Sequence, residues 1–598
     1  MDLFGVLTML GGLALFLYGM DTMGDGLAKM AGGKLEKILE KLTSNTFFGV
    51  LLGAMVTAVI QSSSATTVMV VGFVNSGIMK LTQAVGIIMG ANVGTTITSW
   101  ILSLASIDGG SIFIKMLKPS SFSPILALAG IGLRMFSKKS KHHDIGGILL
   151  GFAVLMFGMQ TMSDAVAPLK DVPEFTSLLL KFSNPVLGMA AGAVITAVIQ
   201  SSSASVGILQ ALCATGAVPF ATAVPIIMGQ NIGTCVTALI SGIGASKNAR
   251  RASLIHLYFN LIGTILFMVL FYVIHAVIPF AFMDGPAHAS GIAMVHTVFN
   301  IFATIMLFPF SKLLVKLATM TIKDDPKAIE AAAAKDDDFM VLDPRFLDTP
   351  AFAIEQCRNV TNRMAQESQK ALELAMGLIY KYDESVAAEV VRLEDVVDRY
   401  EDQLGSYLVK LSSKRLNHYD SNTLSLLLHC IGDYERISDH AVNIKEAAEE
   451  MYNKKVSFSD KAQEEMRVFS RALSDIVAAS VKAFAMEDLQ LATTIEPLEE
   501  VIDYLNSELK QRHIERLRQG RCTIELGFIL TDIITGYERI ADHCSNIACN
   551  LIEIRQDGYE RHSYKDALKS GDNQEFTKDY KHYKEMYQLP KSSITTNA

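Results

Sequence analysis

Long apolar runs fill the first half of the chain, whereas the second half alternates apolar and charged positions with a helical period. The apolar runs lie near 3–20, 48–79, 84–104, 121–137, 145–163, 185–218, 220–243, 253–279 and 290–311. About 20 apolar residues suffice to cross a bilayer as a helix. We therefore expect an all-α protein in which residues 1–315 form a polytopic membrane domain.

The distribution of charge supports this division. Residues 1–310 contain 27 charged side chains and residues 311–598 contain 87. Soluble domains average about 25% charged residues, so the first part is too apolar to be soluble. The acidic balance of the second part argues against nucleic acid as a partner. The seven cysteines lack paired spacing, which indicates reduced thiols rather than a disulfide framework.

Two of the apolar runs, 48–79 and 185–218, are longer than one crossing requires, and each is interrupted by Gln-Ser-Ser-Ser. The sequence TAVIQSSSA occurs at 57–65 and again at 196–204, an offset of 139. The pattern IIMG-x-N-x-GT recurs at the same offset. An internal duplication follows, with repeats at about 1–137 and 140–279 and a last helix at 290–311.

The two interrupted runs are expected to be re-entrant helical hairpins. Three crossings then separate equivalent points, so the second repeat is inverted relative to the first. This topology, with the N-terminus outside, places most loop Lys and Arg residues in the cytoplasm, as the positive-inside rule requires. The hydrophilic half is then cytoplasmic. We expect the protein to lie in the cell inner membrane, in contact with membrane lipid.

A helix that begins at the interruption has free N–H groups and a positive dipole end, which suit an anion. Serine hydroxyls can add hydrogen-bond donors. The predicted anion ligands are these serines: Ser62, Ser63, Ser64, Ser201, Ser202 and Ser203. Inverted repeats bring such segments together near the bilayer midplane, so one anion could bridge both.

No charged residue lies between Lys41 and Lys80 or between Lys181 and Lys247. An anion bound there has no basic partner, so co-bound cations are the natural compensation. Amide and hydroxyl oxygens suit Na+. The predicted cation ligands are Gln61, Gln200, Thr66, Asn92, Thr95, Asn231 and Thr234, with Asp25 and Asp164 as further candidates at helix ends. The alternative is that these polar residues only join helices and that nearby glycines allow close packing.

A second motif, His-x-x-Phe-Asn, occurs at 256–260 and again at 296–300. Both polar residues of each pair share a helical face. They could line a cavity, but hydrogen bonding between helices is the expected role.

The paired QSSS segments, with GANVGTT at 90–96 and GQNIGT at 229–234, resemble the type II sodium-phosphate cotransporter family over about residues 1–315. The resemblance implies phosphate and sodium binding at Gln61 to Ser64 and Gln200 to Ser203. This chain departs from internal symmetry at 204–207, where ASVG stands opposite ATTV, so the two halves need not bind the same ion.

The hydrophilic half is expected to comprise a linker at 316–345, a helical domain at 346–560 made of two three-helix bundles, and a flexible tail at 561–598. Tyr-Glu-Arg-Ile-x-Asp-His occurs at 434–440 and 537–543. Four Glu-x-x-x-Asp pairs place carboxylates one helical turn apart. They are Glu394 with Asp398, Glu435 with Asp439, Glu499 with Asp503, and Glu538 with Asp542. The tandem units resemble the PhoU phosphate-uptake regulator family, which implies a divalent or transition metal there; a solvated acidic face is the alternative.

The leading hypothesis is a sodium-coupled secondary transporter of inorganic phosphate with a PhoU-like regulatory domain. The alternatives are phosphate export, another tetrahedral anion on the same scaffold, or a membrane-tethered phosphate sensor. No group is placed to activate a serine nucleophile, so an enzyme is not expected. The cytoplasmic domain could mediate a homo-oligomer or bind a regulatory protein.

Overall fold

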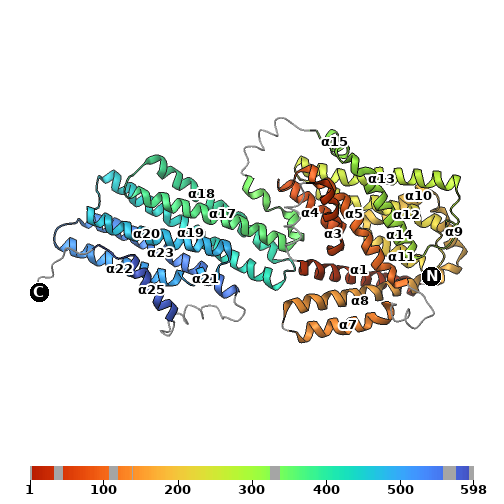
Figure 1. Ribbon diagram of the computed structural model, residues 1–598, viewed down its shortest axis with the longest axis horizontal. Coiled ribbons are helices and arrows are strands. Elements are labelled where there is room, and N and C mark those ends of the chain that lie inside the picture. Colours follow the sequence, from red (N-terminus) through yellow and green to blue (C-terminus); the bar gives the residue numbers. More distant parts are fainter. Residues whose placement is uncertain are drawn as a thin grey trace. The chain divides into compact units, whose positions relative to one another are not determined.

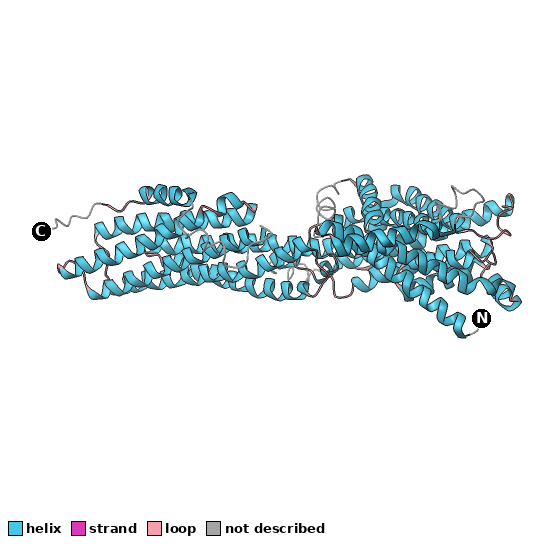
Figure 2. Ribbon diagram, turned by 90° about the horizontal axis from the view of Figure 1, so that it is seen from below, coloured by secondary structure: helices cyan, strands magenta, loops and turns pink. Residues whose placement is uncertain are grey.

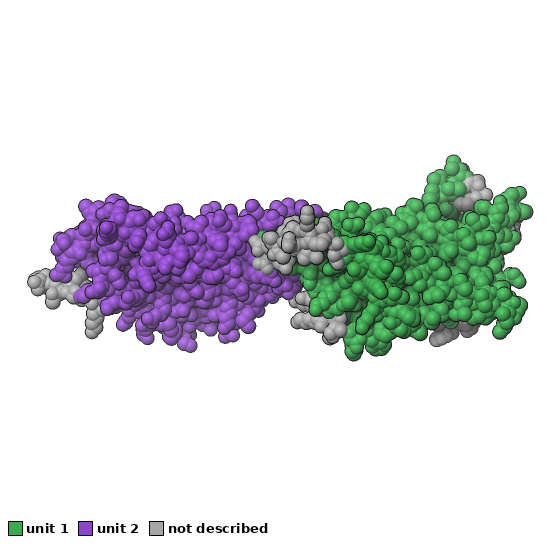
Figure 3. Space-filling view, turned by 90° about the horizontal axis from the view of Figure 1, so that it is seen from above, with its two compact units in different colours: residues 1–352 green, residues 353–598 purple. Residues whose placement is uncertain are grey.

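The structure is a computed structural model that describes residues 3–31, 45–106, 119–137, 139–323, 337–555 and 574–590. Within these ranges the secondary structure is helical and no β-strand is formed (Figure 2). The expected all-α class is confirmed. The chain divides into two compact units, Met1–Phe352 and Ala353–Ala598 (Figure 3).

The first unit is the apolar one. Its helices are α1 (Leu3–Ala31), α3 (Thr46–Ile60), α4 (Ser63–Asn75), α5 (Leu81–Ser103), α7 (Pro119–Phe136), α8 (Ser140–Val166), α9 (Pro173–Lys181), α10 (Pro185–Ile199), α11 (Ser202–Cys213), α12 (Phe220–Ser241), α13 (Lys247–Val277), α14 (Ala289–Leu307) and α15 (Ser311–Thr321). Among the described residues, six helical stretches are long and apolar enough to cross a membrane. They are α1, α5, α8, α12, α13, and α14 continued by α15.

Both interrupted runs form pairs of short helices. In the first pair, α3 and α5 pack side by side and run in the same direction, since Gly49 lies against Gly86 and, further along both helices, Ala54 lies against Gly94. Helix α4 must therefore bring the chain back toward the end at which α3 starts. This is the path of a re-entrant hairpin.

The second pair repeats this arrangement. Gly188 of α10 lies against Pro225 of α12, and Ala193 lies against Gly233 further along. Helices α10 and α12 are thus also parallel, and α11 carries the chain back between them. Equivalent positions of the two repeats make equivalent contacts, as an internal duplication predicts.

Helices α1 and α8 occupy equivalent places in the two repeats and pack against one another, with α7 along the other side of α8 (Figure 1). Gly12 contacts Met162 at one end, and Gly26 contacts Ile148 at the other. Residue numbers rise along α1 as they fall along α8, so the two helices are antiparallel. This antiparallel packing is compatible with the inverted repeats expected from the sequence, which stay a prediction.

The returning half of each hairpin also contacts the opposite repeat. Helix α4 packs against α12, and α11 packs against α5. Helices α13 and α14 complete the group by packing against α5 and α12. The two serine-bearing half-helices are therefore held between the repeats.

The linker expected at 316–345 lies within the first unit, which extends to Phe352, and parts of it are helical. Helix α14 is followed by the short 3₁₀ helix η3 (Phe308–Phe310) and by α15, whose apolar side buries Leu314 and Ala318. After residues 324–336, which lie outside the described part, the chain forms η4 (Asp337–Val341) and η5 (Pro344–Asp348). The expectation of a linker overlooked the apolar residues that follow its charged centre.

The second unit contains α17 (Pro350–Leu378), α18 (Glu384–Ser412), α19 (His418–Lys454), α20 (Asp460–Met486), α21 (Leu489–Ala492), α22 (Ile495–Arg518), α23 (Ile524–Arg555) and α25 (Gln574–Met586). The six long helices expected from the sequence are present, and α19 packs against α23 where the two bundles meet. Helix α25 lies in the part expected to be a flexible tail. It packs on α22, and the Tyr587 hydroxyl donates to Asp475 at 2.6 Å.

Candidate functional site

Each hairpin is broken by one residue in the left-handed region. Gln61 ends α3 with φ 61°, and Gln200 ends α10 with φ 59°. A residue with a Cβ pays roughly 1–2 kcal/mol for this conformation, which glycine adopts freely. Both breaks carry glutamine at a position where glycine would cost less, so these two residues are candidates for a functional role.

The serine after each glutamine caps the next half-helix. The Ser62 hydroxyl accepts from Ala65 N at 3.1 Å, and the Ser201 hydroxyl accepts from Ala204 N at 3.2 Å. Each cap turns the first N–H groups of α4 or α11 toward the break. Since the hydroxyl hydrogens of the capping serines are not consumed by these bonds, they remain able to donate to an anion.

The remaining serines lie inside the fold or at its edge. Ser63, Ser202 and Ser203 are buried, whereas Ser62, Ser64 and Ser201 are half-buried. All six stand in the cap or the first turn of α4 or α11. The predicted anion ligands therefore form two equivalent helix N-termini, as the sequence indicates, and each is uncharged.

A hydroxyl pair joins the two halves of each hairpin. Thr57 donates to Thr66 at 3.0 Å, and the equivalent Thr196 donates to Ser205 at 2.8 Å. At this position the departure from symmetry keeps the hydroxyl and loses only a methyl group, whereas the next two positions replace Thr67 by Val206 and Val68 by Gly207. Because Thr66 also donates to the Ser62 carbonyl, its hydrogen is used within the hairpin.

The asparagines and threonines of α5 and α12 share one orientation. Asn92 and Asn231 donate their amide hydrogens to the carbonyl four residues earlier, at 3.0 and 2.9 Å. Thr95 and Thr234 donate their hydroxyl hydrogens in the same way. With the donors turned to the backbone, the oxygen atoms are left as acceptors, which is the orientation that a cation requires.

Glycines on the same helices have a packing role. A side chain at Gly90 would meet the Val50 carbonyl at 2.0 Å, and one at Gly229 would meet the Met189 carbonyl at 1.9 Å. The close-packing alternative thus holds for these glycines. The close approach of these helices also brings the Asn and Thr side chains of the same motifs beside the hairpins.

One buried network crosses between the repeats. The His296 ring contacts the Ser99 hydroxyl at 2.8 Å and the Asn231 amide oxygen at 3.3 Å. Gln210 of α11 donates to the carbonyls of Ser99 and Ala289. The network therefore joins α5 of the first repeat to α11 and α12 of the second through α14.

The two His-x-x-Phe-Asn motifs behave differently. His296 bonds between helices, as expected. Neither ring nitrogen of the buried His256 has a hydrogen-bond partner in the described residues, and Asn260 donates only to the His256 carbonyl. His256 can therefore serve as a control for His296, because it has the same motif and is equally buried.

The two break glutamines also differ despite identical backbone angles. Gln61 is buried, and its Oε1 has no hydrogen-bond partner among the described residues, whereas Gln200 is exposed. The second repeat instead buries Gln210 and Gln230, whose Oε1 atoms have no hydrogen-bond partner within the described part. We did not predict these two residues from the sequence. Their signal is a glutamine where the first repeat has Val71 or Ala91.

The two candidate aspartates lie at the edge of this region. Gly24, which precedes Asp25, faces the Ile60 carbonyl at the end of α3. Asp164 is exposed and accepts a hydrogen bond from Gln160 at 2.8 Å. The contact of its neighbour Gly24 thereby places Asp25 near a hairpin break.

In the second unit, the acidic pairs of the first bundle come together. Burial and the nearby carboxylates of Asp439 and Asp398 together raise the pKa of Glu435 to about 7, although Arg436 opposes them. Burial, Asp395, Asp398 and Asp439 raise the pKa of Glu394. Crowded carboxylates of this kind favour a bound proton or a cation.

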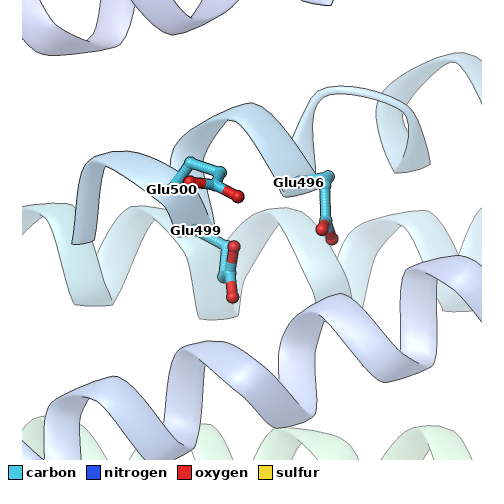
Figure 4. A group of neighbouring side chains, drawn as sticks. All are labelled: Glu496, Glu499 and Glu500. Carbon is cyan, nitrogen blue, oxygen red and sulfur yellow. The ribbon is translucent and has the colours of Figure 1, made fainter. Parts of the chain in front are cut away.

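The second bundle gathers a different acidic set. Carboxylate oxygens of Glu496, Glu499 and Glu500 lie within 4.8 Å of one another on α22 (Figure 4). Glu496 and Glu499 are buried, and Ser545 of α23 donates to Glu496. Of these three, we predicted only Glu499. Its neighbours were overlooked because the four-residue spacing does not include them.

The other predicted acids of the second bundle lie on α22 and α23. Asp503 lies one turn beyond Glu499 on α22, and Asn506 of α22 donates to Glu538 of α23. Asp542 lies 3.7 Å from Arg539, its ion-pair partner on α23.

Comparison with known proteins assigns both units. Residues 15–164 and 171–284 match the Na+/Pi-cotransporter family. Residues 361–448 and 467–551 match the PhoU domain. The chain is 20% identical to PhoU from Pseudomonas aeruginosa, whose crystal structure aligns over 33% of this chain and 95% of that chain with a TM-score of 0.32.

Related proteins extend this result over the whole chain. The chain is 22% identical to a Salmonella typhimurium protein named "Putative inorganic phosphate export protein YjbB", covering 94% of this chain and 99% of the relative. It is 29% identical to sodium-dependent phosphate transport protein 2A of Rattus norvegicus over 30% of this chain and 28% of that protein. These names are those of transporters, which supports the expected absence of enzyme activity. The first unit of this multi-pass membrane protein thus matches the Na+/Pi-cotransporter family, and its second unit matches the PhoU domain.

Proposed function

We propose that this protein is a secondary transporter that couples the movement of inorganic phosphate to Na+, with the second unit as its regulator. The observation that carries the proposal is the matched pair of uncharged, serine-capped helix N-termini at Ser62 and Ser201. Phosphate would bind between Ser62 to Ser64 and Ser201 to Ser203. Each half-helix supplies backbone N–H groups, hydroxyl donors and the positive end of a dipole.

Sodium would balance the charge of the bound phosphate. Neither hairpin contains a charged side chain, so a phosphate desolvated there needs a mobile cation. The amide and hydroxyl oxygens of Asn92, Thr95, Asn231 and Thr234 are oriented to receive one, and Gln61 offers a buried carbonyl oxygen. Thr66, Gln200, Asp25 and Asp164 complete the proposed set, although Gln200 and Asp164 are exposed in this conformation.

Transport would proceed by alternating access between inverted repeats. Two features support this mechanism. Helices α1 and α8 pack antiparallel, and α4 and α11 each contact a helix of the opposite repeat. The proposed topology places the N-terminus outside and the second unit in the cytoplasm of a cell whose inner membrane holds the protein.

The test is labelled phosphate flux into proteoliposomes that contain the purified protein. Uptake is expected only with an inward Na+ gradient, and Ser63→Ala is expected to reduce it. Ser103→Ala is the matched control, because Ser103 is a buried serine that donates only to the Trp100 carbonyl at the end of α5. Uptake that is independent of Na+ would overturn the coupling. Phosphate binding without flux would favour the sensor.

Export is the second candidate, supported by the name of the relatives that align with nearly the whole chain. The direction of a coupled transporter follows the sum of its gradients, so one scaffold can serve both tasks. Efflux from phosphate-loaded proteoliposomes with no Na+ on either side would show export without sodium coupling. Competition by arsenate and by sulfate tests whether another tetrahedral anion is carried.

We further propose that the acidic clusters of the second unit bind a divalent or transition metal. The eight carboxylates predicted from sequence, with Glu496 and Glu500 added, supply hard oxygen ligands. Glu499, Asp503, Glu538 and Asp542 surround the second-bundle site, and Glu394, Asp398, Glu435 and Asp439 the first. Metal analysis of the purified protein tests this proposal. The same unit could join copies of the chain or bind a regulatory protein.

A further inference from the structure

The chain that leads from the first unit into α17 is folded onto that unit. We name residues 343–352 the docking segment; they comprise η5 and the first turn of α17. They contact the last turn of α4, which is the returning half of the first hairpin, and the turn between α12 and α13. The segment thus touches both repeats.

A polar contact fixes the segment to α4. Asn75, the last residue of α4, donates to Asp343 Oδ2 at 2.6 Å and accepts the Ser246 backbone N–H at 2.7 Å. The Asp343 side chain is 1% exposed and also pairs with Arg345 at 2.7 Å. Arg345 donates in turn to the Ser241 carbonyl at the end of α12. A single hydrogen-bonded chain therefore ties the hairpin, the segment and the second repeat together.

An aromatic cluster fixes the same place. Phe346 is fully buried, and its ring centre lies 5.5 Å from that of Phe73 in α4. Phe352 lies 4.9 Å from Phe73 and 4.7 Å from Phe346. A Cβ at Gly72 would lie 2.6 Å from the Phe346 ring, so the glycine makes room for it.

The docking surface belongs to the first hairpin alone. The second repeat has Ala211, Leu212 and Ala214 where the first has Gly72, Phe73 and Asn75. The second repeat therefore lacks the space that Gly72 leaves for the Phe346 ring. It also lacks the Asn75 amide that bonds to Asp343. The asymmetry assigns the segment to one hairpin of an otherwise repeated pair.

We propose that the docking segment is a built-in brake on the first hairpin and that the second unit controls transport through it. The inference rests on the proposed function, because alternating access requires α4 and the end of α12 to move relative to one another. While the docking segment is bound, it holds α4 and the end of α12 together. Since α17 continues without a break from Pro350 to Leu378, any displacement of α17 is transmitted to Phe352.

The test uses the full chain in proteoliposomes and reverses the polar contact. Asn75→Asp places a carboxylate against Asp343, and two carboxylates at hydrogen-bond distance repel. The double variant Asn75→Asp with Asp343→Asn exchanges the two groups and restores a donor and an acceptor. Asn45→Asp is the matched control, since Asn45 caps α3 of the same hairpin and aspartate caps equally well.

Two quantities are measured for each variant, namely hydrogen exchange of residues 63–75 and 343–352, and phosphate flux. Asn75→Asp is expected to raise exchange in both segments about tenfold, the scale of one lost charge-assisted hydrogen bond, and to raise flux severalfold. The double variant is expected to return both toward wild type, and Asn45→Asp to change neither.

Faster exchange with unchanged or reduced flux would overturn the brake, as would unchanged exchange in Asn75→Asp. A failure of the proposed function is distinguishable, because it would abolish flux in every protein, wild type included, whatever the exchange data show. In that case the exchange of α4 alone decides whether the segment restrains the hairpin.

Discussion

The His296 ring lies 3.3 Å from the amide oxygen of Asn231, so a helix outside the two repeats reaches into the cation site proposed for the second. Asn231 donates to the Ile227 carbonyl, so its Oδ1 must accept. His296 therefore donates from Nε2 and accepts the Ser99 hydroxyl hydrogen at Nδ1, which is a neutral imidazole. Asn92 has no such donor among the hydrogen bonds described, and this difference separates the two repeats.

His296→Ala is expected to weaken Na+-dependent uptake, because Asn231 and Ser99 each lose a buried partner. The loss of one such bond is worth about 1–3 kcal/mol, so the half-saturating Na+ concentration should rise about tenfold. His296→Gln, which can bond to both partners, should recover part of the loss.

The control is His256→Ala, because His256 has the same motif and burial but its ring makes no hydrogen bond in the described residues. It is expected to leave the Na+ dependence unchanged. Equal effects of the two alanine variants would show that His296 acts only by filling space.

Gln61→Gly separates the backbone of the break from its side chain. Glycine accepts the left-handed angle without cost, so the thermal stability should stay equal or rise by up to about 1 kcal/mol. Uptake should nevertheless fall, because the buried amide oxygen is removed. A thermal melt and a flux assay on the same preparation measure both effects.

Lys455→Gly is the matched control for this change. Lys455 ends α19 with φ 56°, and it belongs to the second unit and to no proposed transport ligand set. The substitution should stabilise the protein without loss of flux. Full uptake by Gln61→Gly would remove Gln61 from the ligand set.

The sequence was informative where local chemistry decides the structure. Nine identical residues revealed the repeat, and a polar interruption within apolar runs predicted the break at Gln61 and Gln200. Serine after each break predicted the caps at Ser62 and Ser201 that the structure contains.

Tertiary packing decides what the sequence left open. Gln61 and Gln200 share the same neighbours and backbone angles, yet one is buried and the other exposed, because different helices cover them. Phe346 follows a charged stretch, so the pattern indicated a linker, whereas the ring fills the space left by Gly72. Contacts between distant segments cannot be read from local periodicity.

The hydroxyl pair across the second hairpin gives a test of its own. Ser205→Ala removes the acceptor of the Thr196 hydroxyl and leaves a buried donor unpaired, which should cost about 1–3 kcal/mol of stability. Ser205→Thr keeps the hydroxyl and copies the first repeat, where Thr66 occupies the equivalent place. It should retain both stability and flux. Loss in both variants would mean that the site tolerates no added volume.

Metal binding should differ between the two bundles. The second bundle adds Glu496 one turn before Glu499, whereas the equivalent position of the first bundle is Val391. A second buried carboxylate beside Glu499 raises the demand for a cation, so the second bundle should keep its metal more firmly. Glu499→Gln is expected to lower the metal content of the purified protein more than Glu394→Gln does. Chelation should lower the melting temperature of the wild type and have less effect on Glu499→Gln. Equal metal content in both variants, or none in the wild type, would mean that these carboxylates hold protons instead.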